Sequence, residues 1–205
     1  MDNALIKQKE TFNTKPGSQK EINIDIGAKN EIRMMDFLNS KYNNKFKRMK
    51  KKNDNNSNSI DFINHRHKII AEIKSVSYKY TDNYSNNINR KGEYGFWISQ
   101  SKINKYDIKY SVKYPGYDFH IYYLFADGLY NVQYNKLSQS DQILIKNSKY
   151  TDNDNTNPNV ANLQNKVYII PKRCFNIIDL DMKSDFPIKN RDNRDIMRYI
   201  DECLL

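Results

Sequence analysis

Two short isoleucine-rich runs joined by a polar turn constrain the fold of this chain more than any other feature. The runs cover residues 59–64 and 68–76, and their composition predicts two β-strands. If they pair as an antiparallel hairpin with its turn at 65–67, facing residues have numbers that sum to 133. Asp61 then lies directly opposite Glu72, with the two Cβ atoms about 5 Å apart.

A third charged residue falls on the same face of this predicted hairpin. Because side chains alternate along a strand, Lys74 shares the face of Glu72 and lies one pleat further on. The acids stand among apolar neighbours, which favour a central strand over a surface hairpin with an ordinary salt bridge. A divalent cation explains such a cluster, since hard ions such as Mg²⁺ bind carboxylate oxygens. The apolar neighbours are Ile69, Ile70, Ala71 and Ile73.

These residues carry a resemblance to a known family. Asp61 followed by Glu72-Ile73-Lys74 resembles the D…ExK signature of the PD-(D/E)XK nuclease superfamily, which includes many restriction endonucleases and the archaeal-type Holliday-junction resolvases. The position before the first acid is often proline in the family and is Ile60 here.

Context separates this triplet from two other acid-x-Lys triplets in the chain. Asp107 lies in a lysine-rich segment that is predicted to be helical. Asp181 follows a strand-like run, but no acid precedes it at a comparable distance. Only Glu72 lies on a β-branched strand that follows a second apolar strand with its own acid.

An upstream helix extends the resemblance. Apolar residues at 24, 28, 32, 35 and 38 recur at helical spacing, and Glu31 lies beside this stripe. Gly27 stands four residues before Glu31, a G-x-x-x-E pattern that resembles the first helix of the superfamily, whose acid points toward the metal site from behind the sheet. A glycine inside a helix predicts a close packing contact. The order of this helix and three strands is the family's order, over about the first half of the chain.

The resemblance implies both a fold and a chemistry. The fold is α/β (α+β), with a central mixed β-sheet flanked by helices: a restriction endonuclease-like core with an added β-hairpin and a C-terminal helix. The chemistry is hydrolysis of DNA to 5′-phosphate and 3′-hydroxyl ends with Mg²⁺, or Mn²⁺ in its place. Asp61, Glu72 and the carbonyl of Ile73 bind the metal, Lys74 orients the attacking water, and Glu31 binds a second ion through water or braces the site.

The length of 205 residues predicts one domain with appendages. Residues 1–22 are polar and are predicted to form an N-terminal arm. Residues 23–205 then form a single nuclease-like domain, with a core at 23–134 and a C-terminal extension of sheet and helix at 135–205.

The overall composition limits which partners and which cellular location we expect. A net charge of +10 suits a polyanion such as DNA, although an AT-rich genome explains the many lysines and asparagines equally well. No apolar stretch reaches the length of a signal peptide core or a membrane span, so we expect an intracellular protein that is not secreted and has no membrane partner. Cys174 and Cys203 are too few for a disulfide framework or a zinc site. No motif for a small organic cofactor is present.

Candidate contacts to nucleic acid lie in three segments. The basic run at 45–52 is either a charged loop that keeps an edge strand soluble or a loop that contacts phosphates, and the two interpretations are equally weighted. Residues 81–95 are predicted to form a long loop, and 100–109 a helix across the sheet, where surface positions are the simpler interpretation. The candidates are Lys47, Arg48, Lys50, Lys51, Lys52, Arg90, Lys91, Gln100 and Lys102.

The second half of the chain predicts further elements. Residues 118–125 and 129–134 flank an Asp-Gly turn and form the clearest hairpin, which extends the sheet. A short helix is expected at 139–145, and one or two strands at 167–170 and 175–178. A last helix is expected after a cap at Asp192 or Asn193.

The three histidines are not assigned to catalysis. His65 and His67 fall in the predicted turn, and no third histidine or cysteine ligand stands near them for zinc. His120 is expected to be a packed, hydrogen-bonded core residue.

Several functions stay open at this level. Restriction-type or duplex-cutting activity is favoured, because the long loops and second hairpin exceed what a minimal resolvase needs, and cutting two strands favours a homodimer. The alternatives are a Holliday-junction resolvase or repair nuclease, a nuclease for RNA or single strands with tyrosines as stacking platforms, and a catalytically inactive nucleic-acid-binding module on the same fold.

Overall fold

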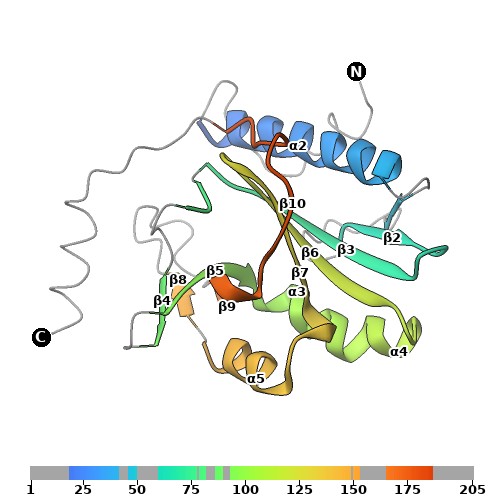
Figure 1. Ribbon diagram of the computed structural model, residues 1–205, viewed down its shortest axis with the longest axis vertical. Coiled ribbons are helices and arrows are strands. Elements are labelled where there is room, and N and C mark those ends of the chain that lie inside the picture. Colours follow the sequence, from blue (N-terminus) through green and yellow to red (C-terminus); the bar gives the residue numbers. More distant parts are fainter. Residues whose placement is uncertain are drawn as a thin grey trace, which may run out of the picture.

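The computed structural model contains two β-sheets and several helices (Figure 1). The fold is mixed α/β, with a central mixed sheet of six strands. The residues that the structure describes are 19–41, 46–49, 60–77, 79–81, 86–89, 93–148, 150–152 and 165–186.

The central sheet contains the predicted hairpin. Only β3 and β6 run parallel in this sheet, and its other neighbouring strands are antiparallel. In spatial order its strands are β1 (Lys47–Arg48), β2 (Phe62–Asn64), β3 (Ile69–Ser75), β6 (Asp118–Phe125), β7 (Gly128–Gln133) and β10 (Asn176–Asp179).

The register of the β2–β3 hairpin confirms the prediction that paired residues sum to 133. Phe62 pairs with Ala71, and Ile63 pairs with Ile70. Strand β2 is shorter than expected, so Asp61 precedes it and is not part of the ladder. The turn is stabilised by Asn64, whose side-chain oxygen accepts the backbone N–H groups of the next turn residues at 3.0 and 3.1 Å.

A second sheet corrects the prediction of a long loop at 81–95. This segment contains β4 (Asn86–Asn89) and the first residues of β5 (Glu93–Ser99). The sheet has the order β4, β5, β9 (Asn165–Pro171) and β8 (Tyr150–Asp152), all antiparallel. The loop prediction was wrong because β5 obtains its hydrogen bonds from β9, far along the chain, which no local pattern indicates.

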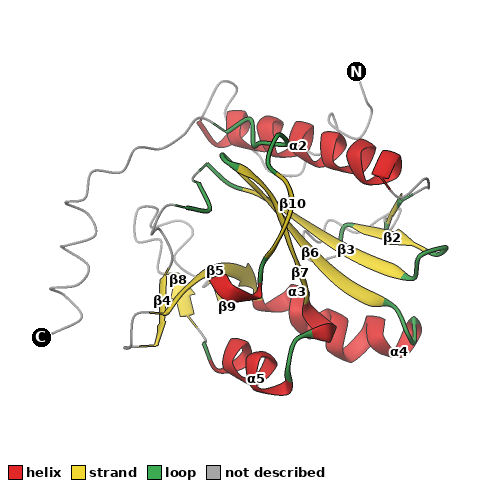
Figure 2. Ribbon diagram, in the orientation of Figure 1, coloured by secondary structure: helices red, strands yellow, loops and turns green. Residues whose placement is uncertain are grey.

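Helices cover both faces of the central sheet (Figure 2). Helix α2 (Gln19–Lys41) lies on one face. On the other face, α3 (Gln100–Lys105), a π-helical turn η1 (Tyr106–Tyr110) and α4 (Ser111–Lys113) form one continuous helical segment, as predicted for 100–109. Helix α5 (Gln139–Asn147) and strands β9 and β10 confirm the later elements, and Ser138 caps α5 by accepting the Asp141 N–H at 3.1 Å.

Each face of the sheet has its own core. Ile70 and Phe119 pack against α3 and η1, with the apolar residues of β5 and β9 in the same cluster. Ala71 and Tyr122, on the opposite face, pack in a cluster with Met34 and Leu38 of α2. Alternation along β3 therefore sends successive side chains into different cores.

The expectations for the N-terminal region need three corrections. The helix begins at Gln19, within the predicted arm. Among its described side chains the buried apolar positions are Ala28, Met34 and Leu38, so positions 28 and 38 of the predicted stripe are confirmed, whereas Ile32 and Met35 are half-buried. Gly27 is not in a close contact, because an added Cβ would meet nothing nearer than Phe186 at 3.9 Å.

Helix α2 is also held by the segment that follows β10. Buried Asn30 donates to Ser184 Oγ at 3.3 Å and accepts the Asp185 N–H at 3.2 Å. Arg33 donates to the Lys183 carbonyl at 2.8 Å and forms an ion pair with Asp185. This segment ties α2 to the tip of the β6–β7 hairpin.

Three remaining predictions concern the rest of the chain. His120 is buried and hydrogen-bonded, 3.3 Å from the Tyr122 hydroxyl and 3.2 Å from the Asn131 amide, as expected for a core residue. Burial lowers its pKa to about 4. The last predicted helix and Cys203 lie outside the described residues. Among the described helices, none combines the length and the apolar character needed to cross a membrane.

Candidate functional site

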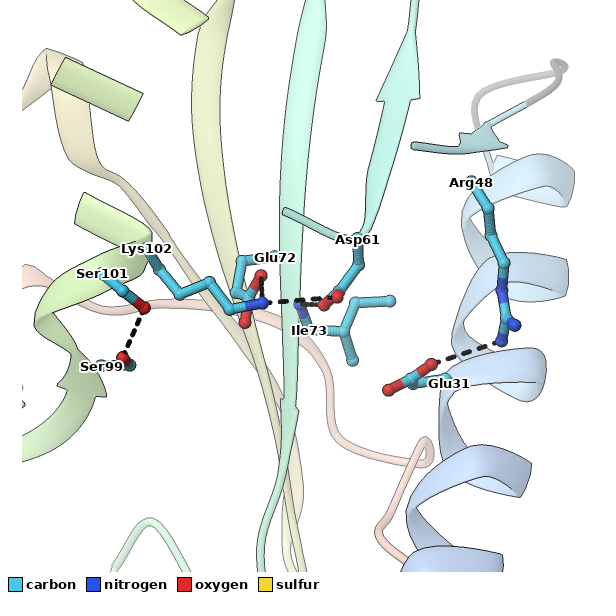
Figure 3. Close-up of polar contacts among 8 residues, drawn as sticks. All are labelled: Glu31, Arg48, Asp61, Glu72, Ile73, Ser99, Ser101 and Lys102. Atoms are coloured by element: carbon cyan, nitrogen blue, oxygen red, sulfur yellow. Dashed lines mark hydrogen bonds and ion pairs between the residues drawn. The ribbon is translucent and has the colours of Figure 1, made fainter. Parts of the chain in front are cut away.

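A buried ammonium lies between the two acids that the hairpin register brings together. Lys102 Nζ lies 2.8 Å from Glu72 Oε2 and 3.6 Å from Asp61 Oδ1 (Figure 3). Glu72 is 2% exposed and Lys102 is 6% exposed, so the pair is screened little by water. The predicted convergence of Asp61 and Glu72 on one face is confirmed, but the cation that contacts them is Lys102.

Three elements position these side chains. Glu72 lies in the middle of β3 and points to the face covered by α3, because its neighbours Ala71 and Ile73 fill the core under α2. Asp61 is fixed by a hydrogen bond from the Ile73 N–H to its Oδ2, at 2.8 Å. Lys102 reaches the site because α3 follows β5 directly and packs across the sheet.

The carbonyl of Ile73 points toward the edge of β3 where Asp61 lies, as its predicted role as a metal ligand requires. The N–H and C=O groups of a strand residue point to the same side of the strand. Because the Ile73 N–H points to Asp61, its carbonyl points to the same edge of β3.

Lys74 follows the predicted alternation but makes a different contact. Its ammonium lies 5.1 Å from the centre of the Trp97 ring. It remains near enough to the acids to lower the pKa of both Glu72 and Glu31. Lys74 is therefore a second positive charge beside the site.

Glu31 approaches from the other side of the sheet, as the resemblance implies. It lies on α2, and its Oε2 accepts a hydrogen bond from Arg48 of β1 at 3.3 Å. Arg48, a predicted nucleic-acid contact, is thus held by Glu31 and by the Phe62 ring, whose centre is 5.8 Å away. Figure 3 shows the Lys102 ammonium between Glu72 and Asp61, with Glu31 and its partner Arg48 on the side of α2.

Burial is the main cause of the raised pKa values of Glu72 and Glu31. Burial raises the pKa of Glu72 to about 8, and the Asp61 charge acts in the same direction, while Lys102 opposes both. Burial likewise raises the pKa of Glu31 to about 7, with Asp61 adding and Arg48 opposing. Burial alone lowers the pKa of Lys102, but Glu72 and Asp61 outweigh it and raise that pKa above its ordinary value.

The other predicted nucleic-acid contacts separate into three groups. Gln100 donates to the Val167 carbonyl at 3.2 Å and so joins α3 to β9. Lys47 is exposed on the edge strand β1. The remaining candidates, Lys50, Lys51, Lys52, Arg90 and Lys91, lie outside the described residues.

Lys102 is the site residue whose role sequence reasoning missed. It was predicted to be a surface residue or a phosphate contact, and it is buried against Glu72. A weak signal was present, because Tyr106 lies four residues later and therefore on the same helical face, and Tyr106 is buried. A lysine in line with a buried tyrosine needs a carboxylate partner.

Only two acids, Asp61 and Glu72, are placed to bind a divalent cation together among the residues that the structure describes. Among the described residues, no three His, Cys, Asp or Glu side chains come together to hold a metal ion. Mg²⁺ is commonly bound through one or two carboxylates, with water and substrate phosphates completing its ligands. Asp61 and Glu72 supply two carboxylates within reach of one cation, which is the number that such a site uses.

Comparison with known proteins identifies no relative. No protein-family model, no curated protein and no solved structure matches the chain. The geometry of the site is therefore the basis for assigning a function.

Proposed function

We propose that this chain is a Mg²⁺-dependent DNA endonuclease of the PD-(D/E)XK type. The observation that carries the proposal is the shared contact of Asp61 and Glu72 with one buried cation, at 3.6 and 2.8 Å. The proposal is supported because two carboxylates that converge on a positive charge, on apolar strands and not on a wet surface, are the ligand type that metal ions use in phosphodiester hydrolysis.

The fold supports the proposal. The order α2, β1, β2, β3 puts Glu31, Asp61 and Glu72 in the sequence of elements that the resemblance implies. The net charge of +10 favours encounter with a polyanion.

Each residue has a role in the proposed mechanism. Asp61, Glu72 and the Ile73 carbonyl would hold the metal, which supplies charge at the scissile phosphate and lowers the pKa of a bound water. Lys74 orients the attacking water. Lys102 offsets charge that develops on the phosphate. Glu31 braces the site from α2 by accepting a hydrogen bond from Arg48 of β1.

The number of strands that are cut determines how many subunits the enzyme needs. One site cuts one strand, so cleavage of both strands of a duplex takes two sites. A symmetric homodimer supplies them with the same residues on each subunit.

A second function has an observation in its favour. Lys102 satisfies both carboxylates with protein groups alone, and an acid pair that is neutralised in this way fits a purely structural role. The rival is a nucleic-acid-binding module that does not cut.

Cutting assays with matched variants separate the two functions. The purified chain is incubated with supercoiled plasmid, a four-way junction and single-stranded DNA, with Mg²⁺, Mn²⁺ or EDTA. We expect metal-dependent cutting that falls by about a hundredfold or more in Asp61→Asn and Glu72→Gln. Asp181→Asn changes the exposed acid of another acid-x-Lys triplet and should cut normally. Binding without cutting, unchanged in the Asp61 and Glu72 variants, supports the module instead.

A further inference from the structure

Trp97 is an exposed aromatic residue next to the candidate site. It is the single tryptophan of the chain, and it is 43% exposed on β5. Its neighbours Phe96 and Ile98 are buried in the core, so alternation turns the indole to the opposite, outer face of the second sheet. The Lys74 ammonium lies over its ring, 5.1 Å from the ring centre.

Lys74 connects this ring to the acids. It lies two residues after Glu72 on the same face of β3, a distance of about 6.6 Å along the strand. Its charge acts on both Glu72 and Glu31. A strand of DNA whose phosphate lies at the acids therefore has its next nucleotide within reach of the indole.

The backbone under Trp97 is held firmly. Its carbonyl accepts a hydrogen bond from the Tyr123 hydroxyl at 2.7 Å, and it pairs with Ile169 in the β5–β9 ladder. A ring on a fixed strand loses little conformational freedom when a flat partner stacks on it.

We propose that Trp97, with Lys74 beside it, is a stacking platform for an unpaired nucleobase, and that the preferred substrate is single-stranded DNA. The inference rests on the proposed function, since it names the substrate of the same site. Bases in a duplex are covered on both faces by their neighbours, so an indole stacks only on a base that has left the stack. Aromatic stacking beside a positively charged path is the usual mode of single-strand binding, and a single-strand cut needs only one site.

The single tryptophan provides a direct assay of this contact. The full chain is titrated in EDTA, which prevents cutting, with oligothymidylate and with a blunt hairpin duplex of equal phosphate number. We expect oligothymidylate to quench the tryptophan fluorescence and to bind about tenfold more tightly than the duplex.

Variants test the ring itself by fluorescence anisotropy of a labelled oligothymidylate. Trp97→Leu should weaken binding about tenfold, whereas Trp97→Phe, which keeps an aromatic face, should bind nearly as the parent chain does. Ile177→Ala removes another exposed apolar side chain, on β10, and should not change the affinity. Equal quenching by the duplex, or full affinity in Trp97→Leu, overturns the inference. The Phe variant keeps the test valid if the Leu variant does not fold.

The result is separable from the cutting assay. Quenching by oligothymidylate without any metal-dependent cutting supports the stacking platform and refutes the nuclease. Metal-dependent cutting without quenching refutes the platform and leaves the nuclease standing.

Discussion

Replacement of Lys102 by methionine tests the central contact of the site through stability. The side chain is buried, and its ammonium contacts both Glu72 and Asp61. Methionine keeps most of the apolar length and removes the charge. We expect Lys102→Met to lower the free energy of unfolding, and by more at high pH than at low pH.

The pKa of Glu72, about 8 in the folded protein, determines this difference. At about pH 6 the folded parent chain keeps Glu72 protonated, so the variant loses about one hydrogen bond, or roughly 1–3 kcal/mol. At about pH 9 the parent carboxylate is charged and stabilised by Lys102, whereas the variant retains the proton. Each pH unit over which only the folded variant holds that proton adds about 1.4 kcal/mol. The loss should therefore be about 1.4 kcal/mol larger at about pH 9.

Denaturant unfolding at the two pH values measures this excess. Lys109→Met makes the same change at an exposed lysine of the adjoining η1 turn and should alter stability by less than about 0.5 kcal/mol at either pH. The double variant Lys102→Met/Glu72→Gln has no carboxylate to titrate at position 72 and should show no excess. An equal loss at both pH values, or an undiminished excess in the double variant, would refute the assignment of Lys102 as the partner of Glu72.

Three further predictions follow from the pKa values, from a turn and from the hold on α2. Because Glu31 and Glu72 have pKa values raised to about 7 and about 8, metal-dependent cutting should increase as the pH rises through that range, and Glu31→Gln should remove the lower limb of the rate profile. Gly128 has φ +154°, and an added Cβ would lie 3.2 Å from the Asp179 carbonyl, so Gly128→Ala should lower the free energy of unfolding by about 1–3 kcal/mol in denaturant. Gly116 has φ +76° but open space around it, so Gly116→Ala should lower the free energy of unfolding by only about 1 kcal/mol. Asn30→Ala should cost about 1–3 kcal/mol and speed amide exchange at residues 184–186; unchanged exchange there would refute the hold on α2.

The local elements of this fold were predictable because local rules determine them. The β2–β3 register follows from a period of two and a short turn, and it placed Asp61 beside Glu72. The β6–β7 hairpin follows from its Asp-Gly turn, where Gly128 adopts a positive φ. The helical segment that begins at Gln100 was also predicted from the sequence.

The second sheet was not predictable from such rules. Strand β4 is rich in asparagine, which is depleted in strands, and it forms only because β5 offers it hydrogen bonds. Strand β5 is in turn paired with β9. Pairings between distant segments leave no periodic trace in either segment.

The site was predicted in its acids and missed in its cations. The hairpin register places Asp61 beside Glu72, and a hydrogen bond from the Ile73 N–H fixes the Asp61 side chain. The partners of long basic side chains depend on tertiary packing, so Lys102 and Arg48, which were predicted to be surface residues or phosphate contacts, are found against Glu72 and Glu31. Lys74 was placed on the correct face, but its contact with Trp97 depends on how β5 packs beside the central sheet, which the sequence did not indicate.

The pairing of β5 with β9 also affects the order in which parts of the chain fold during synthesis on the ribosome. The acidic hairpin can form as soon as its own residues emerge, whereas Phe96 waits for Ile170, about 70 residues later, before its strand has a neighbour on that side. Helix α3 starts where β5 ends, so the lysine that neutralises the acids is seated late. During synthesis Asp61 and Glu72 are therefore brought together first, and α3 with Lys102 is tied to β9 only after Val167, whose carbonyl accepts a hydrogen bond from Gln100, has been made.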